Sequence, residues 1–187
     1  MNDIAVKKVF LFNEKVSLRE FNKEDWMAVH QYASQDQVCQ YQPWGPNSEE
    51  DSKGFIQEVL ANAEQYPRTR HTLAIEFSGK LVGAGELAID DISNRVGEMG
   101  YVVNPDYWGQ GIATEAAQLL IKFGFQELEL HRIFATCDPR NIGSAKVLEK
   151  VGMTKEGRLR EHKLIRDGWR DSFLYSILEH EWKKSNE

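Results

Sequence analysis

The sequence predicts an α+β fold with a mixed, mainly antiparallel central sheet flanked by helices. Three observations carry this prediction: a two-residue hairpin turn at Ser78-Gly79, a strand–helix–strand segment over residues 95–136, and a closing hairpin around Asp167-Gly168. Hairpins give antiparallel strand pairs, whereas a strand–helix–strand connection favours a parallel crossover. At 187 residues the chain is long enough for one core and too short for two domains of usual size, so residues 1–187 are interpreted as a single domain.

The first half of the chain predicts a strand, two helices and the first hairpin. Residues 16–21 form the strand, and a Pro/Gly loop over residues 42–46 separates the two helices. The strands over 72–77 and 80–89 flank the Ser78-Gly79 turn. Each helix is preceded by an N-cap pair of the expected residue types, Asn22 with Asp25 and Ser48 with Asp51.

The second half predicts the crossover and the closing hairpin. Residues 95–104 form a strand that Pro105 ends, and residues 110–128 have a long helical periodicity. Residues 132–136 read as a strand of the buried type. A helix capped by Asn141 then ends at Gly152, and the Asp167-Gly168 hairpin closes the chain.

Composition excludes several functional classes. The net charge of −6 gives no global basic field for nucleic acid. No apolar run is long enough to span a membrane, and the N-terminus lacks a signal-peptide core. Cys39 and Cys137 form no disulfide framework, which indicates reduced thiols in a cytoplasmic protein. Because the five histidines show no metal-ligand spacing, we expect no metal.

The stretch "NPDYWGQGIATEA" (104–116) places two bare glycines directly before a helix. Gly109 and Gly111 expose the backbone, Ala113 keeps the next turn small, and Thr114 offers a hydroxyl. A helix N-terminus presents unpaired N–H groups and the positive end of its dipole, so a phosphate can bind there. A turn that only needs a positive φ is the alternative, and the local residues alone leave both open. Neither a Walker loop nor a dinucleotide fingerprint is present.

Two motifs together carry a family resemblance. "GEMGYVVNPDYWGQGIATEA" (97–116) and "DPRNIGSAKVLEKVGM" (138–153) resemble the GNAT superfamily of acetyl-CoA-dependent N-acetyltransferases. Within it the chain is most similar to the Rim-type (RimJ/RimL) group, which includes enzymes that acetylate the N-terminal residue of ribosomal proteins. The resemblance extends from "VSLREF" (16–21) through the final hairpin. It implies a GNAT-like acyl-CoA N-acyltransferase fold and acetyl-CoA as cosubstrate.

The resemblance also implies which residues contact coenzyme A. The glycine turn would cradle the pyrophosphate, and the strand near Tyr101 would splay from its neighbour to align the pantetheine arm. Trp108 departs from the glutamine or arginine of the family pattern, but the backbone donors of the turn remain. The expected cofactor contacts are Tyr101, Val102, Val103, Trp108, Gly109, Gln110, Gly111, Ile112, Ala113, Thr114, Asn141 and Ser144.

Acetyl transfer requires an amine that has lost its proton and a stabilised thioester oxygen. Glu98 lies where related enzymes often carry a carboxylate that accepts the amine proton, directly or through water; a solvated strand carboxylate is the alternative. Alternation places Glu98, Gly100 and Val102 on one face of the strand and Tyr101 on the other. Ser144, in the family motif Asn-x-x-Ser, is the second catalytic candidate. Many relatives carry a tyrosine acid where this chain has Leu148, so Ser144, water or no acid must serve.

Acceptor contacts are expected from Tyr41 and Trp44 in the 42–46 loop region and from Glu86 on the hairpin strand. The two aromatic rings have an alternative role, tying the loop to the core, and Glu86 has one as a solvated carboxylate. The expected partner is an amine-bearing acceptor, either a protein N-terminus or a small amine such as a polyamine or an aminated antibiotic. The competing class of function is a non-catalytic acyl-CoA-binding or interaction module. A monomer or a homodimer is expected.

Overall fold

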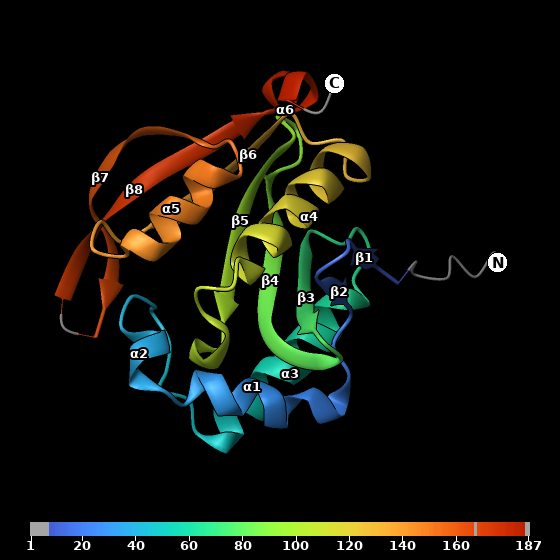
Figure 1. The fold of residues 1–187 in the computed structure, drawn as a ribbon, viewed down its shortest axis with the longest axis vertical. Coiled ribbons are helices and arrows are strands. Elements are labelled where there is room, and N and C mark those ends of the chain that lie inside the picture. Colours follow the sequence, from blue (N-terminus) through green and yellow to red (C-terminus); the bar gives the residue numbers. More distant parts are fainter. Residues whose placement is uncertain (1–7, 167, 186–187) are drawn as a thin grey trace.

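The computed structural model describes residues 8–166 and 168–185, and within them one sheet of eight strands carries the fold (Figure 1). The strands are β1 (Phe10–Phe12), β2 (Ser17–Arg19), β3 (Arg70–Phe77), β4 (Lys80–Asp91), β5 (Val96–Val103), β6 (Arg132–Cys137), β7 (Thr154–Ile165) and β8 (Gly168–Leu178). The α-helices are α1 (Trp26–Ala33), α2 (Asp36–Cys39), α3 (Glu49–Ala63), α4 (Ile112–Gln126), α5 (Ile142–Lys150) and α6 (Glu179–Ser185). Short 3₁₀ turns, Lys23–Asp25 and Pro105–Tyr107, precede α1 and the glycine turn.

The strand order is β1-β2-β3-β4-β5-β6-β8-β7, and β5 with β6 is the one parallel pair among the described strands. Helix α4 connects these two strands, so the predicted crossover is confirmed. The Ser78-Gly79 hairpin and the closing hairpin are confirmed as well. Asp167, one half of the predicted closing turn pair, lies outside the described residues.

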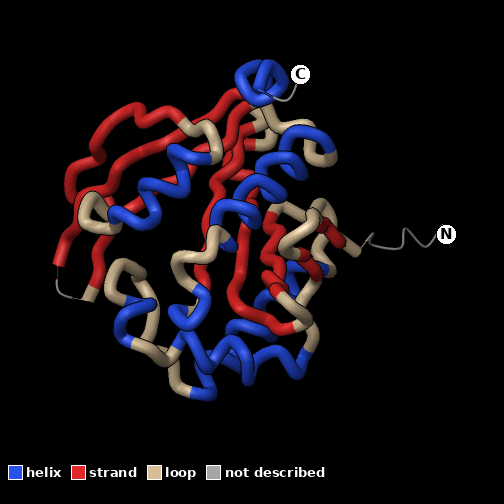
Figure 2. Tube along the Cα trace, viewed as in Figure 1, coloured by secondary structure: helices blue, strands red, loops and turns tan. Residues whose placement is uncertain are grey.

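Helices cover both faces of the sheet (Figure 2). On β3, Leu73 and Ile75 pack into the cluster beneath α4 and α5, while Ala74 between them packs into a second cluster beneath α1 and α3. This alternation follows from the two-residue period of a strand. The sheet therefore separates the two helical layers, and each layer has its own apolar core.

The parallel pairing of β5 with β6 is short. It joins Val96–Glu98 to Arg132–Phe134 and then stops, although both strands continue for several residues. The two strands separate beyond Glu98, as the family resemblance implied. On its other edge β5 stays paired with β4 as far as Val103, so only the β6 side of β5 opens.

The local predictions hold with some corrections at the boundaries. Ser48 caps α3 by accepting from the Asp51 N–H, as predicted. The strand expected over 16–21 is confined to Ser17–Arg19, and the helix expected over 110–128 begins at Ile112. The strand expected to be of the buried type, β6, buries alternate residues, and the residues between them are half-buried. Sequence reasoning missed β1, α2 and α6, which are too short to show a period.

No helix of the described residues is long and apolar enough to cross a membrane. Buried polar residues are few in the same region, and one of them, His71, lies on β3 with 6% of its surface exposed. Its ring meets the Phe123 ring of α4 edge-on at 5.1 Å between centroids. Burial, with the nearby charge of Arg68 as a smaller cause, lowers the pKa of His71 from 6.5 to about 4.

The stability of the fold should therefore fall as the pH drops from 6.5 to 4. In this window the unfolded chain protonates His71 while the folded chain keeps it neutral, so acid favours unfolding. The group contributes about 2 kcal/mol of the stability lost between pH 7 and pH 5. His71→Leu should remove that part of the loss, as measured by urea unfolding at the two pH values. Because the free energy of unfolding of each protein is compared between the two pH values, the packing cost of the substitution cancels. An equal loss of stability in both proteins would contradict the lowered pKa of His71.

Candidate active site

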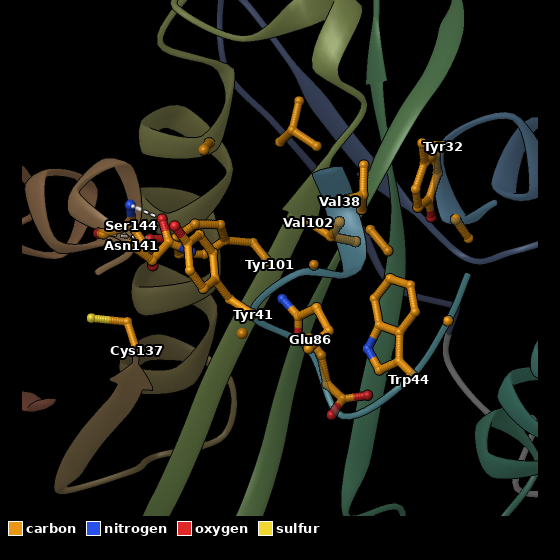
Figure 3. A pocket seen from close by; sticks show the side chains of 18 of the residues that line it. Tyr32, Val38, Tyr41, Trp44, Glu86, Tyr101, Val102, Cys137, Asn141 and Ser144 are labelled. Carbon is orange, nitrogen blue, oxygen red and sulfur yellow. Dashed lines mark hydrogen bonds between the residues drawn. The ribbon is translucent and has the colours of Figure 1, made fainter. Parts of the chain in front are cut away.

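One cavity of about 1660 Å³ lies where β5 and β6 separate. It is lined from the sheet by β4, β5 and β6, from one helical layer by the start of α4 and by α5, and from the other by α3 and the loop after α2. Figure 3 shows part of its wall, with Tyr101 and Ser144 toward one end and Glu86 and Trp44 toward the other. The cavity is thus continuous from the glycine turn to the opposite face of the sheet.

The glycine turn forms the end of the cavity at α4. Gly109 and Gly111 both adopt the left-handed conformation, with φ of 74° and 78°. A Cβ on Gly109 would meet nothing within 4 Å, and one on Gly111 would meet only the Lys15 Nζ, at 3.6 Å. No other part of the described chain fills the space beside the two glycines.

Helix α4 begins at this turn without a side-chain cap, because its N-cap is Gly111. The first backbone hydrogen bond from α4 back to Gly111 is made by the Glu115 N–H, so the N–H groups of the preceding turn have no helical acceptor. Ile112, Ala113 and Thr114 line the cavity, whereas Gln110 does not; the Ile112 side chain is also buried in the core. Open space, free donors and the positive end of the helix dipole fit a phosphate group.

Trp108 has a different role from the polar residue of the family pattern. Its indole Nε1 donates a hydrogen bond of 2.7 Å to the carbonyl of Val103, the last residue of β5. The ring lines the cavity and is half exposed. Trp108 therefore ties the glycine turn to the end of the open strand.

Tyr101 and Val102 lie on opposite faces of the open strand. Val102 packs with the cluster under α1 and α3. The Tyr101 hydroxyl lies 3.1 Å from the Ser144 Oγ and 3.2 Å from the Ser144 carbonyl oxygen (Figure 3). Burial raises the pKa of Tyr101, so the phenol stays protonated. The structure thus brings Ser144 together with a phenol that sequence reasoning did not connect to it.

Asn141 caps α5, because its Oδ1 accepts a hydrogen bond from the Ser144 N–H at 3.0 Å. The cap uses only the oxygen, and Asn141 as a whole lines the cavity, so capping is compatible with contact to a ligand. Leu148, at the position of the family's usual tyrosine, is 1% exposed. Its apolar side chain offers no proton, which leaves Ser144 as the hydroxyl of α5 in this part of the cavity.

Glu98 and Glu86 line the far side of the cavity. Glu98 is 41% exposed, with its Oε1 3.4 Å from the Thr136 Oγ1 and 3.9 Å from the Lys163 Nζ. Glu86 accepts from the Thr72 Oγ1 at 2.6 Å and pairs with Arg70 at 3.0 Å. Since Glu86 lies opposite Gly100 and Glu98 opposite Ala88 in the β4–β5 ladder, the two carboxylates are diagonal neighbours on the sheet.

The two aromatic residues proposed to contact the acceptor lie in the loop between α2 and α3. Trp44 packs against the second core cluster, which is the structural role that the sequence left open, and it also lines the cavity. The Tyr41 hydroxyl donates to the Arg140 carbonyl at 3.4 Å, and the Arg140 guanidinium lies 5.7 Å from the Tyr41 ring centre. Tyr41 thereby reaches across the cavity to the loop before α5.

Charge is unevenly distributed around the cavity. Lys146 and Lys150 line it from α5, on the side of the glycine turn and Asn141. Five acidic and two basic residues line it from α3, β3, β4, β5 and β7: Glu50, Asp51, Glu58, Glu86, Glu98, Arg70 and Lys163. Two further acids and two further bases line it from the loop before α5 and from β8: Asp138, Asp171, Arg140 and Arg170. Across the described residues, no group of three or more His, Cys, Asp or Glu side chains could hold a metal ion.

Sequence reasoning missed three features of this site: the Tyr101–Ser144 contact, the proximity of Lys15 to Gly111, and the carboxylate of Glu58. The first two join segments that are far apart in the chain, and no local signal reports them. The helical period could have predicted Glu58, because it falls on the same helical face as Asp51 and Phe55.

Comparison with known proteins identifies the family. The model of the acetyltransferase (GNAT) domain matches residues 15–154. An N-acetyltransferase of Bacillus subtilis, YnaD, is 38% identical over 170 residues, which cover 90% of this chain and 96% of YnaD. The spermidine N(1)-acetyltransferase of Escherichia coli K12 is 27% identical over 168 residues, or 89% of this chain and 88% of that enzyme.

The fold matches as well. The crystal structure of the ribosomal-protein-S5-alanine acetyltransferase from Vibrio fischeri superposes with a TM-score of 0.81 and 26% identity, covering 93% of this chain and 98% of that one. The similarity of this chain to that enzyme agrees with the Rim-type resemblance of the two motifs. The family model, the near full-length relatives and the opened β5–β6 pair point to one conclusion: this chain belongs to the GNAT family and is an N-acetyltransferase.

Proposed function

We propose that this single-domain enzyme transfers the acetyl group of acetyl-CoA to a primary amine of a small polycation of the polyamine type. The observation that carries the proposal is the continuous cavity, which joins a bare glycine turn at one end to a predominantly acidic lining at the other. An anionic cosubstrate and a cationic acceptor fit these opposite ends. The two free, buried cysteines, Cys39 and Cys137, fit a reducing cytoplasm.

The proposed cosubstrate site follows the cavity from α4 to α5. The N–H groups of Gly111, Ile112, Ala113 and Thr114 hold the diphosphate, and the unpaired edge of β5 from Tyr101 to Val103 holds the amides of the pantetheine arm. Asn141 adds its free side-chain NH₂ group, and Trp108 keeps the turn against the end of β5.

Acetyl-CoA supplies an activated acetyl thioester, and the chain supplies proton transfer and polar contacts. Glu98 accepts the proton that the acceptor ammonium must lose; its exposure allows a water molecule to relay that proton. An N–H on the open edge of β5 donates to the thioester oxygen as negative charge develops there. The Ser144 hydroxyl, oriented by Tyr101, donates to the leaving sulfur.

The acceptor side is proposed to select positive charge. Glu58 has no hydrogen bond or ion pair among the described residues, so its carboxylate is available to an ammonium group. Glu86 is already paired with Arg70 and Thr72, and it would contribute through its charge near the sheet. Trp44 and Tyr41 offer aromatic faces on which an alkylammonium chain can lie. The similarity to a spermidine N(1)-acetyltransferase supports this choice.

A protein N-terminus is the second candidate acceptor. It is favoured by β7, which is an edge strand whose Lys163 and Ile165 line the cavity. A peptide can add to such an edge and place its amino group inside. The similarity to a ribosomal-protein-alanine acetyltransferase also supports it.

Thiol release in the presence of acetyl-CoA tests the function directly. The panel contains a triamine, a diamine, a monoamine of equal chain length, and peptides beginning with alanine or serine. We expect the polyamines to give the highest kcat/KM. Peptide turnover above that of the amines would support the second candidate, and tight acetyl-CoA binding without turnover of any acceptor would identify a non-catalytic module.

Glu98→Gln should lower kcat about 100-fold near pH 7, because a carboxamide cannot accept the amine proton. Affinity for acetyl-CoA, measured by calorimetry, should be nearly unchanged. Glu86→Gln is the matched control: it removes a neighbouring cavity carboxylate and should raise the KM of the amine without a comparable loss of kcat. An unaltered kcat and pH–rate profile in Glu98→Gln would remove Glu98 as the base.

Glu58→Lys should raise the KM of a triamine about tenfold while changing that of the monoamine less, because the second and third ammonium groups meet the reversed charge. Glu64→Lys makes the same change at the C-cap of the same helix, outside the cavity lining, and should leave both KM values unchanged. Equal effects of the two variants would show that only the overall field matters.

Gly111→Val should weaken coenzyme A binding at least about tenfold, a loss of about 1.4 kcal/mol. A valine side chain obstructs the turn and is strained at a φ of 78°. Gly152→Val is the matched control, since Gly152 also has a left-handed φ, of 87°, and lies away from the cavity. If calorimetry finds normal affinity in a folded Gly111→Val protein, the phosphate assignment fails.

A further inference from the structure

Lys15 lies beside the glycine turn although it belongs to the N-terminal part of the chain. It belongs to the loop between β1 and β2, and its Nζ is 3.6 Å from the position that a Cβ on Gly111 would occupy. It is the one side-chain atom of the described residues within 4 Å of that position. An ammonium group therefore stands at the edge of the space that the two glycines leave open.

The loop that carries Lys15 is fastened to the first turn of α4. The Asn13 side chain donates to the Glu115 Oε2 at 3.0 Å, and its Oδ1 accepts from the N–H groups of Lys15 and Val16, each at 2.9 Å. Val16 is buried in the core. The backbone of Lys15 is thereby held at a fixed place relative to Gly111, and only the side chain remains free to adjust.

The Lys15 ammonium has no internal partner. Within residues 8–166 and 168–185, no carboxylate lies within ion-pair distance of its Nζ, and no hydrogen bond from it is present. Holding an exposed, unpaired lysine next to a helix N-terminus gains no stability for the fold, because the dipole and the ammonium have the same sign. The arrangement becomes favourable when an anion binds between them.

The charge of the whole chain makes such a cation useful. The protein carries a net charge of −6, which repels an anionic cosubstrate. Lys146 and Lys150 also line the cavity, from α5, whereas Lys15 is the cation whose ammonium lies beside Gly111. Backbone N–H groups supply partial charges there but no full positive charge.

We propose that Lys15 binds the diphosphate of coenzyme A, adding a full positive charge to the backbone donors of the glycine turn. The inference rests on the proposed cosubstrate site and names a residue outside the segments that carry the family motifs. It follows that the β1–β2 loop, through its bond to Glu115, is part of the cosubstrate site.

Calorimetry with a graded set of ligands tests the proposal without requiring turnover. Coenzyme A, 3′-dephospho-coenzyme A and pantetheine are titrated into the wild type, Lys15→Ala, Lys15→Glu and Lys122→Ala. Lys122 is an exposed lysine on α4 outside the cavity lining, so it controls for the loss of one positive charge. The first two ligands retain the diphosphate, and pantetheine lacks every phosphate.

We expect Lys15→Ala to weaken binding of both coenzyme A and its 3′-dephospho form about fivefold. Lys15→Glu should weaken it further, pantetheine binding should not change, and Lys122→Ala should match the wild type. The difference between wild type and Lys15→Ala should also shrink as salt is raised.

Equal affinity of Lys15→Ala and wild type for coenzyme A would overturn the proposal. So would an effect that disappears with the 3′-dephospho ligand, since Lys15 would then contact the other phosphate, and an equal loss in Lys122→Ala, which would reflect net charge alone. Failure of the wild type to bind coenzyme A would instead refute the proposed cosubstrate site itself, so the two failures are distinguishable.

Discussion

The early end of the β5–β6 pairing is the constraint on which the site depends. A parallel pair normally continues as long as both strands do, because each residue past the end leaves backbone donors and acceptors without partners. Here the pair stops after Glu98, while β4 holds the other edge of β5 straight to Val103. The open edge therefore remains rigid, and a ligand with amide groups can complete it. Tyr101, by bonding to Ser144, sets the distance at which α5 stands from that edge.

The helix N-termini differ in whether a side chain of the chain itself caps them. Ser48 and Asn141 each accept one of the first N–H groups of α3 and α5 with their own side chains, so those helix ends are capped from within the chain. Gly111 gives α4 no such partner, and the left-handed turn aims the unused N–H groups at open space. That arrangement stabilises the fold less than a capped helix would. The proposed cosubstrate site accounts for it, because the diphosphate of coenzyme A would take the place of the missing partner.

Much of the fold was predictable because its signals are local. The Ser78-Gly79 hairpin, the Ser48–Asp51 pair and the long period of α4 depend on residues within a few positions of one another. The family motifs located the glycine turn and Asn141 for the same reason. The contact of Lys15 with the turn and that of Tyr101 with Ser144 depend instead on how distant segments pack, and no spacing in the chain encodes them. The strand β1 was not predicted, because its three residues are too few to show an alternating pattern.

The proposed function requires one acidic protein to bind two oppositely charged substrates, and the distribution of charged residues along the cavity explains how it can do so. The net charge of −6 favours a cation at long range, and the acidic residues of α3 and the sheet continue that field into the cavity. The same negative field repels an anionic cosubstrate. Binding it requires cations within a few ångströms of its phosphates, because at that distance a local charge outweighs the screened field of the whole chain. We propose Lys15, beside α4, as such a cation, and Lys146 and Lys150 line the cavity from α5. In the proposed mechanism the acetyl transfer takes place between the two kinds of charge, where Glu98 and Ser144 line the same cavity.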